Sequence, residues 1–180
     1  MKNNLKLRDV IEDDLPIFFE QQLASDANFM AAFTAKDPAN QEAFDAHWDR
    51  ILADETVIIQ TIISSGHIVG YVLSYKTDGK LEVSYWIGRV HWGQGLATVA
   101  LSDFLIHTNR IRPIYARVAK DNLGSIRVLQ KCGFKIIGEA IGFANARGEE
   151  IEELVLELIA KGEGEEGDGS TTSRGKLLTV

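Results

Sequence analysis

The chain has 180 residues, 45% of them apolar and 25% charged, which fits a single soluble domain with a buried core. Its formal net charge of −7 argues against a protein that binds nucleic-acid phosphates, since such a protein needs clustered lysine and arginine. The single cysteine, Cys132, excludes an intrachain disulfide, and without an apolar run long enough for a signal peptide or a membrane span the chain is expected to be cytoplasmic.

The first third of the chain predicts one strand followed by two helices. Residues 5–10 are expected to form the strand. Acids at residues 12–14 favour the first turn of a helix, which we expect to run to about Leu23. A second helix is expected over residues 38–53.

Three strands are expected next, over residues 56–63, 68–75 and 81–87. The segments between them, Ser64-Ser65-Gly66 and Thr77-Asp78-Gly79, have the composition of hairpin turns. This part of the chain therefore predicts an antiparallel meander.

The second half of the chain alternates helices and strands. A glycine turn leads into a helix that is apolar over most of its circumference, as is typical of a helix packed on a sheet. The remaining elements are a strand over residues 114–119, a helix over 122–132, and strands over 134–144 and 149–159. The order β-α-α-β-β-β-α-β-α-β-β predicts one α/β (α+β) domain with a mixed sheet over residues 1–160. Residues 161–180, rich in Gly and Glu, are expected to form a flexible tail.

The glycine turn, Trp92-Gly93-Gln94-Gly95-Leu96-Ala97, carries the clearest chemical signal. A turn between a strand and a helix leaves backbone N–H groups unpaired at the positive end of the helix dipole. Glycines allow an anion to approach those groups, so a phosphate or diphosphate is the expected ligand. The alternative is that the glycines only make a tight turn.

Two other phosphate motifs fail at this turn. A P-loop would need lysine and then Ser or Thr where Gln94 and Gly95 stand. A dinucleotide-binding fold would need its glycines in the first strand–helix unit, with an acid about 20 residues later, and neither condition is met. A nucleotide-binding protein is therefore disfavoured. The four histidines show no paired spacing, so no metal site is expected.

Two stretches resemble a known family. EVSYWIGRVHWGQGLATVAL is similar to the acetyl-CoA-binding motif of the GNAT superfamily, in its RimJ/RimL-like branch. In that branch an aromatic residue often stands at the first position of the motif, which is Trp92 in this chain. ARVAKDNLGSIRVLQKCGFKIIGE is similar to the second signature of that branch. The resemblance covers about residues 3–160. It implies the GNAT acyl-CoA N-acyltransferase fold with splayed central strands, and an enzyme that transfers the acetyl group of acetyl-CoA to a primary amine.

The same resemblance implies which residues hold acetyl-CoA. The amides from Gly93 to Thr98 would bind its diphosphate, and the strand ending at residues 86–88 would pair with its pantetheine arm. Asn122 would hydrogen-bond the arm, and Ser125 would lie near the sulfur. The implied set is Trp86, Ile87, Gly88, Trp92, Gly93, Gln94, Gly95, Leu96, Ala97, Thr98, Asn122 and Ser125. The alternative for Asn122 and Ser125 is that they only start a helix.

Catalysis needs an uncharged amine and benefits from a proton donor at the leaving thiolate. We predict that Glu82 is the base, acting through one water, with a solvated strand carboxylate as the alternative. The family's usual tyrosine acid is replaced by Leu129, which makes Ser125 the candidate donor and Tyr85 and Tyr115 outside candidates. Cys132 is expected to be a buried apolar residue rather than a nucleophile.

The acceptor is expected to be a protein N-terminal α-amine or a small-molecule amine. Its pocket is expected between the first two helices and the last hairpin, with Phe29, Phe33, His47 and Trp48 on one side and Phe143 and Asn145 on the other, unless these aromatic residues are core. A catalytically silent module that binds or senses acyl-CoA remains the alternative function. No nucleic-acid or membrane partner is expected, and a monomer and a homodimer are both compatible with the sequence.

Overall fold

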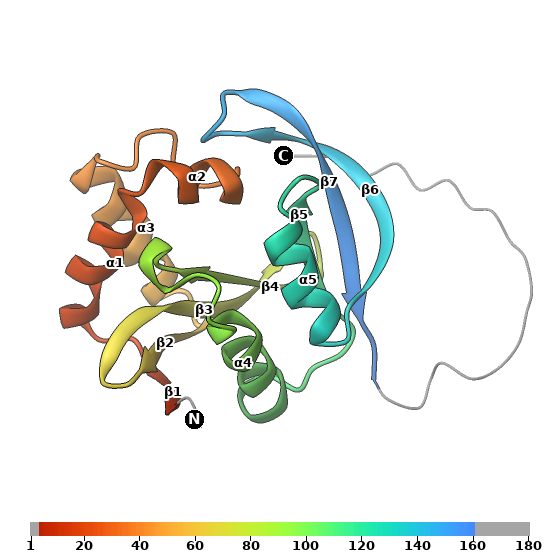
Figure 1. Ribbon diagram of the computed structural model, residues 1–180, viewed down its shortest axis with the longest axis horizontal. Coiled ribbons are helices and arrows are strands. Elements are labelled where there is room, and N and C mark those ends of the chain that lie inside the picture. The colour runs from red at the N-terminus through yellow and green to blue at the C-terminus, as the bar shows by residue number, and fades with distance from the viewer. Residues whose placement is uncertain (1–3, 161–180) are drawn as a thin grey trace, which may run out of the picture.

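A seven-stranded mixed sheet organises the computed structural model, which describes residues 4–160, with the strands in the order β1-β2-β3-β4-β5-β7-β6 (Figure 1). The expected tail over residues 161–180 lies outside the described part. The strands are β1 (Leu5–Asp9), β2 (Ile58–Ser64), β3 (His67–Thr77), β4 (Lys80–Ile87), β5 (Ile114–Ala119), β6 (Lys135–Ala144) and β7 (Glu149–Leu158). The order of strands and helices expected from the sequence is confirmed, apart from one additional helix.

Five α-helices and three short 3₁₀- or π-helical segments complete the described chain. The α-helices are α1 (Leu15–Gln22), α2 (Ser25–Ala31), α3 (Gln41–Ala53), α4 (Leu96–Asp103) and α5 (Leu123–Lys131). The short segments are the 3₁₀ helices η1 (Glu12–Asp14) and η2 (Arg89–His91) and the π-helix η3 (Phe104–Thr108), which continues α4. Within residues 4–160, no helix is long and apolar enough to cross a bilayer.

The two central strands separate along most of their length. All neighbouring strands pair antiparallel except β4 and β5, which run parallel and are paired only at Glu82 and Tyr115. Both strands continue beyond that position without pairing, so their backbones diverge toward their carboxyl ends. The splay implied by the family resemblance is confirmed.

Side chains alternate between the two faces of the sheet, and each face has its own helices. On one face, apolar residues of β4, β5 and β7 form the main core with α4 and α5, and Leu101, Phe104 and Leu156 in it are fully buried. On the other face, α1 and α3 cover β3 with an aromatic cluster in which Phe18 stacks on Trp48 at 5.0 Å between ring centroids.

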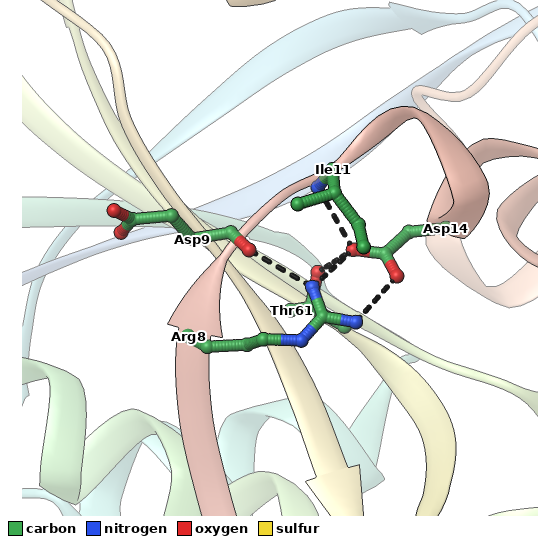
Figure 2. Close-up of polar contacts among 5 residues, drawn as sticks. All are labelled: Arg8, Asp9, Ile11, Asp14 and Thr61. Carbon is green, nitrogen blue, oxygen red and sulfur yellow. Dashed lines mark hydrogen bonds and ion pairs between the residues drawn. The ribbon is translucent and has the colours of Figure 1, made fainter.

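A partly buried ion pair fixes the start of the N-terminal helices to the sheet (Figure 2). Asp14 is 1% exposed and receives both Arg8 Nη atoms at 2.6 Å and the Thr61 hydroxyl at 2.6 Å. Its carboxylate also accepts the Ile11 amide at 3.1 Å. Burial alone would raise the pKa of the Asp14 carboxyl, but the hydrogen bonds from Arg8 and Thr61 outweigh it and hold the pKa below its usual value.

One sequence-based boundary was wrong and one helix was missed. The helix expected from residue 12 to about Leu23 is confirmed as η1 followed without a break by α1, but the separate helix α2 after it was not expected. Ala24 is extended, and the Asn28 side chain donates to the carbonyls of Gln22 and Ala24, so the freed backbone acceptors at the break are satisfied. The helix expected from residue 38 begins at Gln41, because the Asn40 side chain caps it by accepting the Ala43 amide at 2.9 Å.

Candidate active site

A cavity of about 450 Å³ lies where β4 and β5 separate. Its walls come from α2, the carboxyl half of β4, the turn leading into α4, the strand β5, the first turn of α4, and α5 along its length. Tyr85 and Ile87 line it from the face that carries α4 and α5, whereas Ser84 and Trp86 line it from the opposite face. The cavity therefore passes through the sheet at the splay and is accessible to groups from both faces.

The splay leaves backbone groups of β4 without a strand partner. The Gly88 amide donates to the Val69 carbonyl on β3 at 2.8 Å. Because residues in an antiparallel pair alternate in the direction of their backbone groups, the Ile87 amide points away from β3 and toward the splay. The Ile87 carbonyl is engaged by the Trp92 indole N–H at 2.8 Å, which fixes the glycine turn to the end of β4.

The glycine turn leaves the N-terminus of α4 open toward the same cavity. Gly93 and Gly95 have φ angles of 75° and 74°, in the left-handed region, and a Cβ added to either would meet nothing within 4 Å. Gly95 is the N-cap residue and provides no side-chain hydrogen bond, and the Val99 amide is bonded to its carbonyl at 3.2 Å. The amides of residues 96–98 thus precede the first such bond, and their residues line the cavity.

Three basic side chains surround the turn. His91, Arg127 and Lys131 line the cavity together with the glycine turn. Arg127 and Lys131 are exposed and lie four residues apart on α5, so they occupy one helical face. Sequence reasoning missed His91 and Arg127 as charge partners for an anion, although the spacing of the two α5 residues could have indicated this face.

Most of the residues predicted to bind acetyl-CoA are brought together. Those that line the cavity are Trp86, Ile87, Trp92, Gly93, Gly95, Leu96, Ala97, Thr98, Asn122 and Ser125. Gly88 and Gln94 do not line it. A Cβ at Gly88 would lie 3.0 Å from the Gln21 side chain, so this glycine permits close packing of α1 on the sheet. Gln94 is exposed, and its amide nitrogen lies 3.5 Å from the Val90 carbonyl.

Asn122 has a structural role as well as a place in the cavity wall. Its Oδ1 accepts the Ser125 amide at 3.1 Å and so caps α5, as the alternative interpretation proposed. Its Nδ2 donates to the Met30 carbonyl at 3.1 Å, which connects α5 to α2. This cap holds Ser125 in the first turn of α5, facing the cavity.

Ser125 is paired with Tyr85. The Tyr85 hydroxyl lies 2.6 Å from Ser125 Oγ, and both residues line the cavity. Burial raises the pKa of Tyr85 to about 12, although the hydrogen bond to Ser125 opposes the rise. Tyr115 lies on the other face of the sheet opposite Glu157 and does not line the cavity, so of the two outside tyrosine candidates only Tyr85 reaches it.

Glu82 belongs to a buried charge cluster beside the cavity. It is 5% exposed, and its carboxylate accepts the Arg117 Nε at 3.3 Å and the Tyr75 hydroxyl at 3.2 Å. Arg117 also donates to Glu153 at 2.8 Å and lines the cavity, whereas Glu82 does not. The alternative that Glu82 is a solvated carboxylate is therefore wrong, because both of its oxygens are engaged by neighbouring side chains.

Cys132 is a structural thiol. It is partly buried, and its Sγ donates to the Thr98 carbonyl at 3.6 Å, which connects the end of α5 to α4. Burial raises the pKa of the Cys132 thiol to about 11, so it is uncharged near neutral pH. Within the described residues, no group of three or more His, Cys, Asp or Glu side chains is arranged to hold a metal ion.

The acceptor side of the cavity differs from the expected one. Trp48 is 2% exposed within the aromatic cluster of α1 and α3, so for this residue the alternative of a core position is confirmed. None of the six residues expected on this side lines the cavity. The cavity wall on this side is formed instead by Ala27, Met30 and Ala31 of α2. This helix was not expected from the sequence.

Comparison with known proteins identifies the family. The family model described as an acetyltransferase (GNAT) domain matches residues 4–135. The chain belongs to the GNAT acetyltransferase family. An uncharacterized N-acetyltransferase, p20 of Bacillus licheniformis, is 28% identical over 95 residues, which cover 51% of this chain and 53% of that protein. The chain spans about half the length of the curated relatives it matches.

Solved structures share the fold at low sequence identity. RimJ of Mycobacterium smegmatis, in complex with CoA-disulfide, has a TM-score of 0.74 and 20% identity, covering 89% of this chain and 84% of that one. Spermidine N-acetyltransferase of Vibrio cholerae, in complex with CoA and spermine, has a TM-score of 0.71 and 16% identity, covering 86% and 95%. At these identities the likeness supports the GNAT fold alone.

Proposed function

We propose that the protein is an N-acetyltransferase that transfers the acetyl group of acetyl-CoA to a primary amine by direct attack on the thioester. The observation that carries this proposal is one cavity that joins the uncapped N-terminus of α4 to the open backbone of the splay and reaches both faces of the sheet. One face can then hold the acyl donor while the amine approaches from the other.

The residues present fit acetyl-CoA. The amides from Gly93 to Thr98 would hold its diphosphate at the positive end of the α4 dipole, with Arg127 and Lys131 supplying further positive charge. The exposed backbone of β4 would pair with the pantetheine arm, and Asn122 would contact the arm with the remaining lone pair of its Oδ1. Bound acetyl-CoA supplies the activated acetyl group, while this chain supplies its orientation.

Three groups of the chain can assist the transfer. The Ile87 amide, directed into the splay, is placed to stabilise negative charge on the thioester oxygen. Ser125 can donate a hydrogen bond to the departing sulfur. Glu82 can accept the amine's proton only through an intermediary such as water or Ser84, since its own oxygens do not line the cavity.

The acceptor is proposed to be a protein N-terminal α-amine or a small-molecule amine. We further assign the chain to the RimJ/RimL-like branch, on the support of its two signature stretches and its fold similarity to RimJ. The similarity to an enzyme named for spermidine supports keeping small polyamines among the candidates.

Leu129 supports a second candidate, a silent acyl-CoA-binding module. It is 2% exposed in the main core and occupies the position of the family's usual tyrosine acid. The two candidates are separated by a panel of amines and peptides with detection of released thiol. The transferase proposal predicts that at least one amine accelerates thiol release over solvent hydrolysis. If acetyl-CoA binds and no amine in a broad panel does so, the silent module is the better account.

Ligand specificity is tested by thermal unfolding with acetyl-CoA, ATP or NAD. A ligand at 100 times its Kd stabilises the folded state by about 2.7 kcal/mol. We expect this stabilisation with acetyl-CoA and none with NAD. Equal or greater stabilisation by NAD would contradict the proposed donor.

A further inference from the structure

The Tyr85–Ser125 pair connects the main core to the cavity. Tyr85 lies on β4, on the face that packs against α5, and its ring is partly buried against the core. Ser125 lies in the first turn of α5, where the Asn122 cap holds its backbone. Among the α5 residues that line the cavity, only Ser125 carries a hydroxyl group.

Either hydroxyl of the pair can donate to the other at 2.6 Å. A partly buried tyrosine O–H needs an acceptor, because leaving it unpaired costs free energy. The acceptors within reach are Ser125 Oγ at 2.6 Å and the Ser125 carbonyl at 3.4 Å. In the arrangement that uses the shorter contact, on which the inference rests, Tyr85 donates to Ser125 Oγ. The Ser125 hydrogen is then turned away from Tyr85 and is free to point into the cavity.

Two neighbouring α5 positions do not compete for the role. Leu129, one turn further along α5, is buried and apolar. The Cys132 thiol donates to the Thr98 carbonyl. A serine hydroxyl rotates freely unless a neighbour fixes it, and Tyr85 is the neighbour that removes the competing orientation.

We propose that Tyr85 is a positioning residue, which fixes the Ser125 hydroxyl as a hydrogen-bond donor to the sulfur of coenzyme A. This inference rests on the proposed function, because it needs the thiol end of the cofactor near Ser125. Ser125 keeps its proton and shares it with the sulfur, on which the electron pair of the broken carbon–sulfur bond stays. The proton lost by the amine nitrogen balances that charge through solvent.

The first test uses binding rather than turnover. The thiol of bound CoA is titrated by the ultraviolet absorbance of its thiolate, in the wild type and in the variants Tyr85→Phe and Ser125→Ala. A donor to the thiolate lowers the thiol pKa, so removing it is expected to raise that pKa by about one unit in both variants. The affinity for CoA at a pH where the thiol is protonated is expected to stay within about threefold of wild type.

Tyr115→Phe is the matched control. It removes a tyrosine hydroxyl from the neighbouring strand on the other face of the sheet, outside the cavity lining. The thiol pKa of CoA bound to this variant is expected to equal that of the wild type. An unchanged thiol pKa in Tyr85→Phe, or an equal change in Tyr115→Phe, would overturn the inference.

The second test is a double-mutant cycle with an accepted amine. Tyr85→Phe is expected to lower kcat about tenfold with little change in the KM for acetyl-CoA. In a Ser125→Ala background the same change is expected to have no further effect, because Tyr85 acts through Ser125. Additive effects would overturn the inference and leave the proposed function intact. Failure of the wild type to bind CoA would overturn the inference and the proposed function together. Normal CoA binding with a higher thiol pKa in Tyr85→Phe than in the wild type supports the inference even if no amine is acetylated.

Discussion

Two helices begin at the same cavity, and their first turns are built in opposite ways. The α4 helix begins at Gly95 without a side-chain cap, so its first amides stay open. The α5 helix begins at Asn122, whose side chain accepts the Ser125 amide. A glycine at the N-cap costs only about a few tenths of a kcal/mol relative to asparagine, so the open end of α4 is nearly as stable as a capped one. The open end suits an anionic ligand, and the capped end suits the precise positioning of Ser125.

Capped helix starts also occur far from the cavity. Asn40 caps α3, and the Asp14 carboxylate accepts the Ile11 amide where η1 begins. In both places a side chain of the protein accepts the backbone N–H group, so these caps contribute to stability and not to ligand binding. Helices α1 and α2 also start without a side-chain cap, but α1 continues directly from η1, and the Asp26 carboxylate accepts the Ala27 amide in the first turn of α2. The start of α4 differs because it follows two glycines and faces the cavity, which is why we assign the anion to it.

The largest expected effect follows from closing the open helix end. Gly95→Val puts a branched side chain where the ligand would lie, and we expect affinity for acetyl-CoA to fall by about 100-fold or more. Gly79→Val is the matched control, because Gly79 has the same φ of 74° with nothing within 4 Å, in the turn between β3 and β4. Calorimetry should show normal affinity in the control. Equal affinity in the two variants would remove the assigned anion site.

Removing the capping carboxylate of η1, which is far from the cavity, should lower the stability of the protein without changing its affinity for acetyl-CoA. Asp14→Asn leaves Arg8 without its carboxylate, and we expect a loss of about 2–3 kcal/mol in the free energy of unfolding near neutral pH. Because the pKa of Asp14 is lowered in the folded state, its contribution is complete above the unfolded pKa of about 3.9 and disappears as the pH falls through the folded value. Urea unfolding over a pH series checks this, and a wild-type–variant difference that grows below pH 4 would contradict it.

Removing the cap beside the cavity should affect both properties. Asn122→Ala is expected to destabilise the protein by about 1 kcal/mol and to weaken acetyl-CoA binding by roughly 2- to 10-fold. Asn40→Ala is the control, since it removes an equivalent cap from α3. We expect it to lower stability by a similar amount at unchanged affinity. If both variants bind acetyl-CoA as well as the wild type does, Asn122 has only a structural role.

The smallest effect is expected from the charges around the open end. Arg127→Ala should weaken acetyl-CoA binding by about two- to fivefold, and the difference should shrink as salt is added, because exposed charges are screened. Arg50→Ala, an exposed arginine on α3 that does not line the cavity, serves as the control. A loss of affinity that does not depend on salt would argue for a packing role of Arg127 instead.

The sequence predicted most strands well because short apolar runs are bounded by glycine turns, as at Gly66, Gly79 and Gly148. It also placed the glycine turn at a strand–helix junction, and Gly93 and Gly95 line the cavity, whereas anion binding at this turn stays a prediction. It missed α2, because the extended backbone at Ala24 ends the preceding helix, and the Asn28 side chain that satisfies the freed carbonyls is not revealed by periodicity. It also did not reveal that Glu82 is buried in a cluster with Arg117, which depends on the register between β4 and β5.

The central claim is that the open first turn of α4 binds the diphosphate of acetyl-CoA. The most direct measurement is an NMR titration that follows the backbone amide resonances as acetyl-CoA is added. The account predicts saturable shifts that are largest from Gly93 to Thr98, where the amides receive the anion. Saturable binding with the largest shifts elsewhere, or no shifts at a saturating concentration, would contradict it.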